Sequence, residues 1–280
     1  MSIKQKLMHY SWDIAYGVCT DDIIRNGLEN VRLNIVKNPY SSKWFADPFI
    51  LEEDANIIQF LVEEFDYSVG RGRIARLVVD KKDNEIKECH IILDLPTHLS
   101  FPVIYRIDAN IYVHPENSVS GSSFIYLYDR NADELVKPTL MIDEPITDAI
   151  IRKDENCYHM FATKIPESNG CELHEYRSLN LLGPYKYVCT DMYDKNTARM
   201  AGKFIELPMG GVVRPAQDCS EDYGKAVIMY DGHKELCRIT PTSYKYAGIH
   251  TFNILGNTFV IDLKKYDYPF IYKLIRTIKR

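Results

Sequence analysis

The sequence predicts an all-β protein, a single five-bladed β-propeller, and two observations carry this prediction. Short β-rich runs separated by Asp, Asn, Gly and Pro dominate the chain, whereas helical periodicity is scarce. The turns and the strand openings also recur with a period of about fifty residues, which in an all-β chain is typical of propeller blades. Two compact domains are the alternative interpretation. The clearest β-rich runs are IIQFLVEE (57–64), RIARLVVD (73–80), FIYLYD (124–129) and AVIMYD (226–231).

A hairpin turn precedes the second strand of each repeat. Every turn contains Asn or Gly, residues that accept the positive φ of tight turns. The turn residues are 54, 46, 55 and 46 positions apart along the chain. They are Asn56, Asn110, Asn156, Gly211 and Asn257.

A polar residue opens the strand ahead of each turn, again at a regular spacing of 53, 48, 51 and 51 residues. The first strand of each blade lines the central channel of a propeller. We therefore expect these five side chains to form a ring at one mouth of the channel. They are Asp47, Ser100, Asp148, Arg199 and His250.

The repeat also predicts the blade boundaries. The last repeat is short of strands, so we expect residues 10–18 to pair with it and close the ring. Residues 264–280 are basic and form a C-terminal tail, either a helix or strand packed on the propeller or a basic amphipathic helix at a membrane surface. The predicted blades are residues 44–95, 96–144, 145–192, 197–244 and 246–263.

Composition excludes several classes of function. A net charge of −5 argues against a nucleic-acid partner. The N-terminus has no apolar segment of signal-peptide length, and no run reaches the ~18 apolar residues of a membrane helix. The seven cysteines are scattered, without a Cys-x-x-Cys pair. We therefore expect reduced thiols in a cytoplasmic protein and no zinc site.

The second strands end in polar groups at the same mouth. Glu63 with Glu64, and His114 with Glu116, belong to the first two blades; the fourth carries Arg214, Gln217 and Asp218. Acids and arginines at one mouth suit a polar ligand such as a sugar. Glycoside hydrolysis also requires a pair of carboxyl groups, one to protonate the leaving oxygen and one to activate water or attack the sugar carbon. Alternatively, these groups satisfy one another as a structural plug.

Seven short motifs occur in a fixed order along the chain. They are WFADPF (44–49), HLSFPV (98–103), Pro-Glu-x-Ser (115–118), Arg-x-Ala-Gly (199–202), Arg-Pro-Ala-Gln-Asp-Cys (214–219), Tyr-Gly (223–224) and Gly-x-His-Thr (248–251). Together they resemble the propeller domain of plant glucosamine inositolphosphorylceramide transferases and related bacterial proteins, over residues 12–262. The chain has no room for the separate glycosyltransferase domain of the plant enzymes, so the resemblance does not imply transferase activity.

More distantly, the architecture is similar to the five-bladed propellers of glycoside hydrolase family 43. That resemblance implies a general base at Asp47 and a residue that orients and tunes the acid at Asp148. The family's acid position falls at Arg199, so the acid is missing from its usual place, and Glu116 or Asp218 would have to replace it. Some family members hold an axial calcium ion with a His, which here would be His250.

The leading hypothesis is therefore a protein of glycoside-hydrolase type, with catalytic residues Asp47, Glu116 and Asp148. The arginines favour an acidic or phosphorylated sugar, because guanidinium groups bind such anions bidentately. A non-catalytic module that binds glycans in surface-polysaccharide or glycolipid assembly and a structural interaction scaffold remain open. The expected substrate-binding residues are His98, Ser100, Arg199, Arg214, Gln217, Asp218 and His250.

Overall fold

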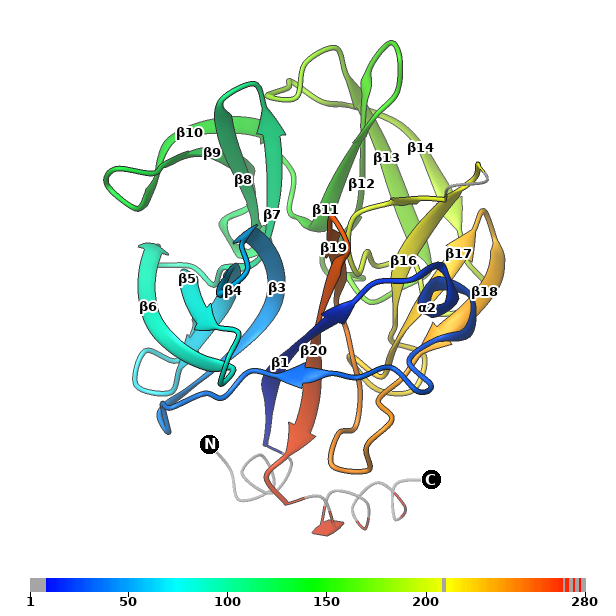
Figure 1. Ribbon diagram of the computed structural model, residues 1–280. Helices are drawn as coiled ribbons and strands as arrows, with labels where there is room; N and C mark the ends of the chain where they lie inside the picture. Colours follow the sequence, from blue (N-terminus) through cyan, green and yellow to red (C-terminus); the bar gives the residue numbers. More distant parts are fainter. Residues whose placement is uncertain (1–8, 208–209, 269, 272–273, 275–276, 278–280) are drawn as a thin grey trace.

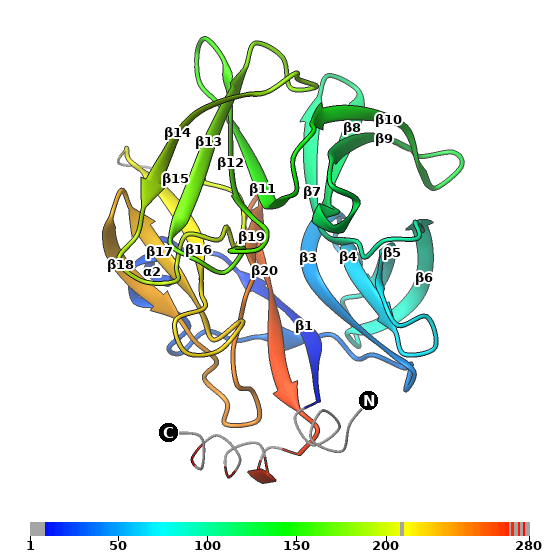
Figure 2. The same cartoon turned by 180° about the vertical axis from the view of Figure 1, so that it is seen from behind.

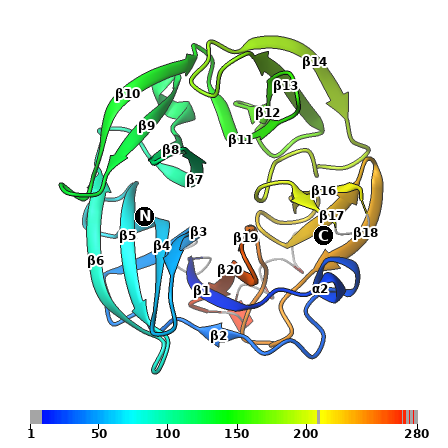
Figure 3. The same ribbon diagram turned by 45° about the horizontal axis from the view of Figure 1, so that its top comes forward.

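Five four-stranded antiparallel sheets are arranged around a common axis (Figures 1 and 3). The computed structural model describes residues 9–207, 210–268, 270, 271, 274 and 277. The predicted all-β class and five-bladed propeller are confirmed. Figure 2 shows the same ring of sheets from behind.

The first three blades each take four consecutive strands, with the first strand next to the axis (Figure 3). Blade one contains β3 (Lys43–Glu53), β4 (Ile57–Asp66), β5 (Gly72–Asp80) and β6 (Glu85–Leu93). Blade two contains β7 (Ser100–Ile107), β8 (Asn110–Glu116), β9 (Ser123–Asp129) and β10 (Glu134–Ile142). Blade three contains β11 (Ile146–Lys153), β12 (Tyr158–Lys164), β13 (Glu172–Ser178) and β14 (Lys186–Met192).

Blade four has a very short inner strand. The segment around Arg199, which we expected to open that strand, precedes it and joins the sheet only through the bridge between Met200 and Ala216. Around this bridge the Gln217 amide donates to the Arg199 carbonyl and the Ala201 amide donates to the Pro215 carbonyl, so Arg199 is held beside β16. The strands of blade four are β15 (Ile205–Glu206), β16 (Val212–Asp218), β17 (Ala226–Asp231) and β18 (Lys234–Ile239).

Blade five joins the two ends of the chain. Strand β1 (Tyr10–Val18) pairs along its whole length with β20 (Thr258–Tyr266), between Tyr10–Tyr266 and Val18–Thr258. Strands β19 (Phe252–Leu255) and β2 (Asn34–Ile35) complete the sheet. The link from β1 to β2 contains helix α2 (Asp21–Asn26), which contacts β18 of blade four.

Strand β20 runs to Tyr266, so Lys264 and Lys265 are strand residues rather than the start of a tail. Lys264 is 1% exposed, and its ammonium group lies 4.7 Å from the ring centre of Tyr10. The basic tail residues at 273, 276, 279 and 280 lie outside the described residues. Within the described part of the chain, no helix is long and apolar enough to cross a membrane.

The five predicted hairpin turns lie where the sequence placed them, but Asn does not provide the positive φ. In blades two, four and five positive φ angles occur at Asp108, Gly211 and Gly256. In blade one the carboxylate of Asp54 accepts hydrogen bonds from the next backbone amides, and Asp154 does the same in blade three. These two turns are therefore stabilised by an aspartate side chain.

A β-bulge on the inner strand of the first three blades sets the polar residues of the axis. One residue of each bulge has left-handed backbone, with a positive φ: Asp47 (51°) in blade one, Phe101 (45°) in blade two and Asp148 (46°) in blade three. Each lies where the register between the first and second strands shifts. Such backbone is strained unless its surroundings hold it in place. Phe101, rather than Ser100 as we expected, is thus the blade-two equivalent of Asp47.

Candidate functional site

The imidazole of His250 lies between two buried carboxylates at the axis. Its Nε2 is 3.1 Å from Oδ1 of Asp47, and its Nδ1 is 2.7 Å from Oδ2 of Asp262. All three side chains are at most 5% exposed. Asp47 and His250 are therefore in contact, as the sequence pattern predicted. Asp262 on β20 was missed by the sequence analysis, although it ends the TFVID run that follows the fifth turn.

Asp262 organises the backbone around this cluster. Its oxygens accept hydrogen bonds from the amides of His250, Thr251 and Asp47, and from the Thr251 hydroxyl. The carboxylate of Asp47 in turn accepts the amide of Phe101 in blade two, at 3.1 Å. Asp262 thus connects blade five to blade one, and Asp47 connects blade one to blade two. These bonds hold the strained bulge in place.

Electrostatics make His250 a cation. Burial lowers its pKa, but the charges of Asp262 and Asp47 outweigh burial and raise the pKa to about 10. The ligand atoms of Asp47, His250 and Asp262 lie within 4.8 Å of one another, but only two of the three side chains offer oxygen, and Asp262 already accepts four hydrogen bonds. Calcium prefers six to eight oxygen ligands. The residues around His250 therefore do not fit the calcium ion that the distant resemblance implied.

A second cluster joins blades three and four. Arg199 binds Asp148 through two bonds, Nε to Oδ2 at 2.6 Å and Nη2 to Oδ1 at 3.2 Å. Gln217 donates to the same carboxylate at 2.6 Å, and Asn169 accepts from Nη1 of Arg199 at 2.7 Å. The carboxyl group of Asp148 is therefore fully engaged. Burial opposes the charge of Arg199, but Asp148 and Tyr223 outweigh it and raise the arginine pKa well above its usual value.

The register of the inner strands shows that Glu63 and Glu116 are equivalents. Ala46 pairs with Glu63 in blade one, just as Ser100 pairs with Glu116 in blade two. Glu116 accepts hydrogen bonds from the Ser100 hydroxyl at 3.2 Å and from the Ser118 amide at 2.9 Å. Burial and the charge of Asp148 nevertheless raise the pKa of Glu116.

Glu63 is the more strongly perturbed acid. It is 5% exposed, and its buried Oε1 has no hydrogen-bond partner. Burial, followed by the negative charge of Asp47, raises its pKa well above the usual value. His98 lies nearby, with Nε2 3.3 Å from Oε1 of Glu63, and burial and Arg199 lower the pKa of His98. Glu63 therefore keeps its proton to a higher pH than an exposed glutamate does, and it was not among the site residues selected from the sequence.

Arg214 and Asp218 lie away from these clusters, contrary to expectation. They alternate with Gln217 along β16, and alternate residues of a strand point to opposite faces. Arg214 donates to the carbonyl groups of Ala198 and Thr197 and lies against the Tyr193 and Tyr230 rings. Asp218 contacts Arg238 and Ser220. The contacts of both residues thus lie outside the clusters around Asp47 and Asp148.

Three partly exposed groups border the buried clusters. Tyr10 is 36% exposed, and the negative charge of Glu63 adds to burial in raising its pKa. Tyr223 lies with its ring centre 5.5 Å from the guanidinium carbon of Arg199. The Arg199 side chain itself is 13% exposed. The partly exposed groups at this mouth are therefore two phenols and a guanidinium, which can form hydrogen bonds with a polar ligand.

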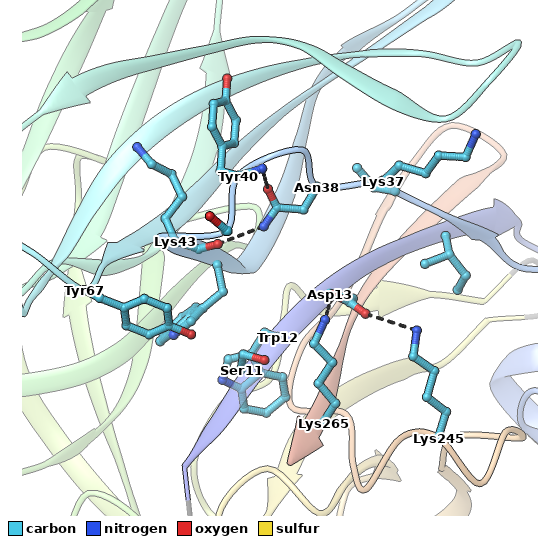
Figure 4. A pocket seen from close by; sticks show the side chains of 14 residues that line it. Ser11, Trp12, Asp13, Lys37, Asn38, Tyr40, Lys43, Tyr67, Lys245 and Lys265 are labelled. Carbon is cyan, nitrogen blue, oxygen red and sulfur yellow. Dashed lines mark hydrogen bonds and ion pairs between the residues drawn. The ribbon is translucent and has the colours of Figure 1, made fainter. Parts of the chain in front are cut away.

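A separate pocket of about 490 Å³ lies between blades five and one (Figure 4). Trp12, which stacks on His250, belongs to its wall. Lys245 and Lys265 converge on Asp13, while Lys43 binds Glu64 at 2.6 Å. These lysine charges are neutralised by carboxylates of the chain, so the pocket does not by itself indicate an anion-binding site.

Comparison with known protein families identifies the family of this chain. The family described as "Glucosamine inositolphosphorylceramide transferase 1, N-terminal" matches residues 31–251. The chain belongs to this family. The resemblance inferred from the seven motifs is thereby confirmed.

Two curated relatives carry the name glucosamine inositolphosphorylceramide transferase 1. The protein of Oryza sativa subsp. japonica is 26% identical over 218 residues, which is 75% of this chain and 28% of the relative. The protein of Arabidopsis thaliana is 25% identical over 193 residues, 66% of this chain and 25% of the relative. The matched segment of this chain thus spans about a quarter of each relative, and the activity of the whole relatives does not pass to it.

Solved structures of family 43 glycoside hydrolases share the fold. A β-1,3-galactosidase in complex with galactodeoxynojirimycin has a TM-score of 0.54 at 9% identity, covering 78% of this chain and 84% of that one. An exo-β-1,3-galactanase from Phanerochaete chrysosporium has a TM-score of 0.52 at 12% identity, covering 66% and 47%. At these identities the likeness establishes the propeller fold alone.

Proposed function

We propose that this propeller is a carbohydrate-recognition domain, which binds a sugar or glycan at the axial mouth and does not hydrolyse it. The observation that carries the proposal is the bidentate pair of Arg199 and Asp148. According to the distant resemblance to family 43 glycoside hydrolases, Arg199 falls where those enzymes have their general acid. Asp148 binds this arginine, so it is not available to tune a proton donor.

The groups that border the buried clusters supply the binding chemistry. Arg199 is partly exposed beside Tyr223, and the Glu116 carboxyl is held by Ser100 and the Ser118 amide. A guanidinium group favours ligands with carboxylate or phosphate. The family name refers to glucosamine and to a phosphate-containing glycolipid. We therefore propose an amino, acidic or phosphorylated sugar of glycolipid or surface-polysaccharide assembly, with a cytoplasmic location as a further prediction.

Isothermal titration with glucosamine, glucuronic acid, myo-inositol 1-phosphate and neutral glucose tests the proposal. The key variant is the double substitution Arg199→Gln with Asp148→Asn, which removes both charges without leaving one buried and unpaired. The control is Arg76→Gln with Asp133→Asn, because Arg76 and Asp133 form a similar bidentate pair away from the axis. We expect at least about a tenfold loss of affinity in the first variant only.

Two results would overturn the proposal of binding without hydrolysis. One is the absence of binding to every sugar of the panel, and the other is equal binding by wild type and the Arg199/Asp148 variant. Release of free sugar from a glycoside would exclude a purely binding role and would favour the second candidate.

Glycoside hydrolysis is that second candidate, and the raised pKa of Glu63 beside Asp47 favours it. Two carboxyl groups whose environments differ are the usual pairing of acid and base. Glu63, or its equivalent Glu116, would protonate the leaving oxygen. Asp47 would take a proton from the water that attacks the sugar carbon. Asp47 is 4% exposed, so this mechanism requires the mouth to open for water.

A panel of 4-nitrophenyl glycosides tests hydrolysis directly. If wild type releases nitrophenol, we expect Asp47→Asn and Glu63→Gln to lower kcat about 100-fold or more, because each removes one proton-transfer partner. Glu116→Gln identifies which glutamate is the donor. Undiminished turnover by Asp47→Asn would reject this assignment of the base.

A further inference from the structure

The turn between β11 and β12 gathers three metal-binding side chains outside the axial site. Oδ2 of Asp154 lies 2.7 Å from Nε2 of His159, and Sγ of Cys157 lies 3.1 Å from the same nitrogen. The Cys157 sulfur is 3.9 Å from Oδ2 of Asp154. One oxygen, one sulfur and one nitrogen therefore face a common point, in the sequence Asp-x-x-Cys-x-His.

These separations match a tetrahedral zinc site. With zinc bonds of about 2.0–2.3 Å, the edges of such a tetrahedron are about 3.4 Å between nitrogen and oxygen and about 3.6 Å to sulfur. Each of the three measured separations lies within about 0.7 Å of its ideal edge, a shift that small side-chain rotations supply. Oxygen, nitrogen and sulfur together suit Zn²⁺ or Co²⁺ better than Ca²⁺ or Mg²⁺.

The backbone of the turn already orients the carboxylate ligand. Oδ1 of Asp154 accepts the amides of Asn156 and Cys157, at 2.8 and 2.7 Å. The other carboxylate oxygen therefore points to His159 and remains able to bind a metal. This arrangement fixes the carboxylate before any ion arrives, which lowers the entropy cost of binding.

A carboxylate behind the histidine provides an independent indication of metal binding. Oε1 of Glu175 lies 2.8 Å from Nδ1 of His159 and is itself bound by Nε of Arg177 at 2.9 Å. Zinc-binding histidines almost always donate their second nitrogen to such a group, which directs the lone pair of the first nitrogen to the metal. Glu175 lies on β13, so the supporting group comes from the neighbouring strand of the same blade.

We propose that Asp154, Cys157 and His159 form a site for Zn²⁺ or a similar divalent transition metal, with its fourth position open to solvent. This differs from the expectation of no zinc site, which rested on the absence of a Cys-x-x-Cys pair and did not consider a mixed set of ligands. The Cys157 thiol releases its proton to water when the metal–sulfur bond forms. The site lies at the end of β11 opposite Asp148. Asp154 follows Asp148 by six positions, which in extended strand corresponds to about 20 Å. The proposal is therefore independent of sugar binding at the axis.

Cobalt binding by the full chain tests the proposal. Co²⁺ is titrated into chelator-treated protein, and the thiolate-to-cobalt charge-transfer band and the ligand-field bands are recorded. We expect a 1:1 complex with tetrahedral intensity. The charge-transfer band disappears in Cys157→Ser and persists in Cys171→Ser, a control thiol of the same blade that contacts Asn196.

Three further variants separate ligands from supporting groups. Asp154→Asn keeps an oxygen that accepts the turn amides, so it folds while losing the anionic ligand. We expect it and His159→Gln to weaken Zn²⁺ binding at least tenfold, and Glu175→Gln to weaken it about 10–100-fold. Circular dichroism confirms folding of each variant. Absence of a 1:1 complex, unchanged affinity in Cys157→Ser, or loss of the band in Cys189→Ser alone would overturn the assignment.

Discussion

The imidazole of His250 stacks on the indole of Trp12, with ring centres 4.0 Å apart and an angle of 29° between the planes. Trp12 lies on β1, and His250 lies two residues before β19, the inner strand of blade five, so the contact joins the two ends of the chain. A protonated imidazole over an aromatic face is further stabilised by the cation–π interaction. The charge of His250 is therefore part of the closure of the ring.

The first prediction concerns the pH dependence of stability. The pKa of His250 rises from 6.5 to about 10 on folding. The folded state therefore binds more protons between these values, and stability falls as pH rises from about 6.5 to 10. Urea unfolding at pH 6, 8 and 10 measures the decline, which we expect to be a few kcal/mol. His250→Gln should be less stable at pH 6 and show a flatter profile, and an identical profile would contradict a charged His250.

The second prediction concerns Glu63. Burial and Asp47 raise the pKa of Glu63 in the folded state. In the unfolded state this carboxyl ionises near pH 4.3, whereas in the folded state it keeps its proton to higher pH. The contribution of Glu63 to the free energy of unfolding is therefore complete below about pH 4.3, and it is lost as pH rises through the folded-state pKa. We expect Glu63→Gln, which is always neutral, to raise Tm at pH 7 relative to wild type and to change it little at pH 4. Glu64→Gln is the control, because Glu64 is ion-paired with Lys43 and Arg73. A lower Tm of Glu63→Gln at pH 7 would show that this carboxyl is ionised.

The third prediction concerns the pair of Arg199 and Asp148. Removing one partner leaves a buried charge unpaired, which typically costs about 3–5 kcal/mol. We expect Arg199→Gln and Asp148→Asn each to destabilise the protein by about 3 kcal/mol. The double variant should cost clearly less than the sum of the two, because the two charges are removed together. Urea unfolding of all four proteins gives the coupling energy, and additive effects would argue against the pair.

The fourth prediction concerns Gly248 in the Gly-x-His-Thr motif. A Cβ atom at this position would lie 1.9 Å from the carbonyl oxygen of Gly224, so the backbone would have to move. We expect Gly248→Ala to destabilise the protein by at least about 2 kcal/mol. The control is Gly256→Asn, because no atom lies within 4 Å of its Cβ position and Asn tolerates its positive φ. Equal stability of Gly248→Ala and wild type would show that this close approach is not required.

The blade pattern could be predicted from the sequence because it depends on local chemistry. Turn residues and β-rich runs recur along the chain, and each blade closes mostly through neighbouring strands. The same reasoning identified Ser100 as the blade-two equivalent of Asp47, which was wrong by one residue. The sequence pattern selected the polar residue of this segment, whereas the strand register places the apolar Phe101 at the bulge.

Side-chain partners at the axis could be predicted only in part. Asp47 and His250, like Asp148 and Arg199, were expected near one mouth and are in contact. Arg214 and Asp218 were expected there too, yet the alternation of β16 turns them to the opposite face from Gln217. Glu63 was noted beside Glu64, but only the strand register shows which of the two faces Asp47.

The sequence by itself thus determined the class of fold, the number of blades and the family, because strand propensity, turn chemistry and motif order are written in neighbouring residues. The tertiary structure decided which polar groups meet. Asp262 and Asp47 lie 215 residues apart and Arg199 and Asp148 lie 51 apart, yet each pair is linked by a hydrogen bond. Whether such a carboxyl group is charged depends on its burial and on its neighbours in space, which only the closed ring establishes.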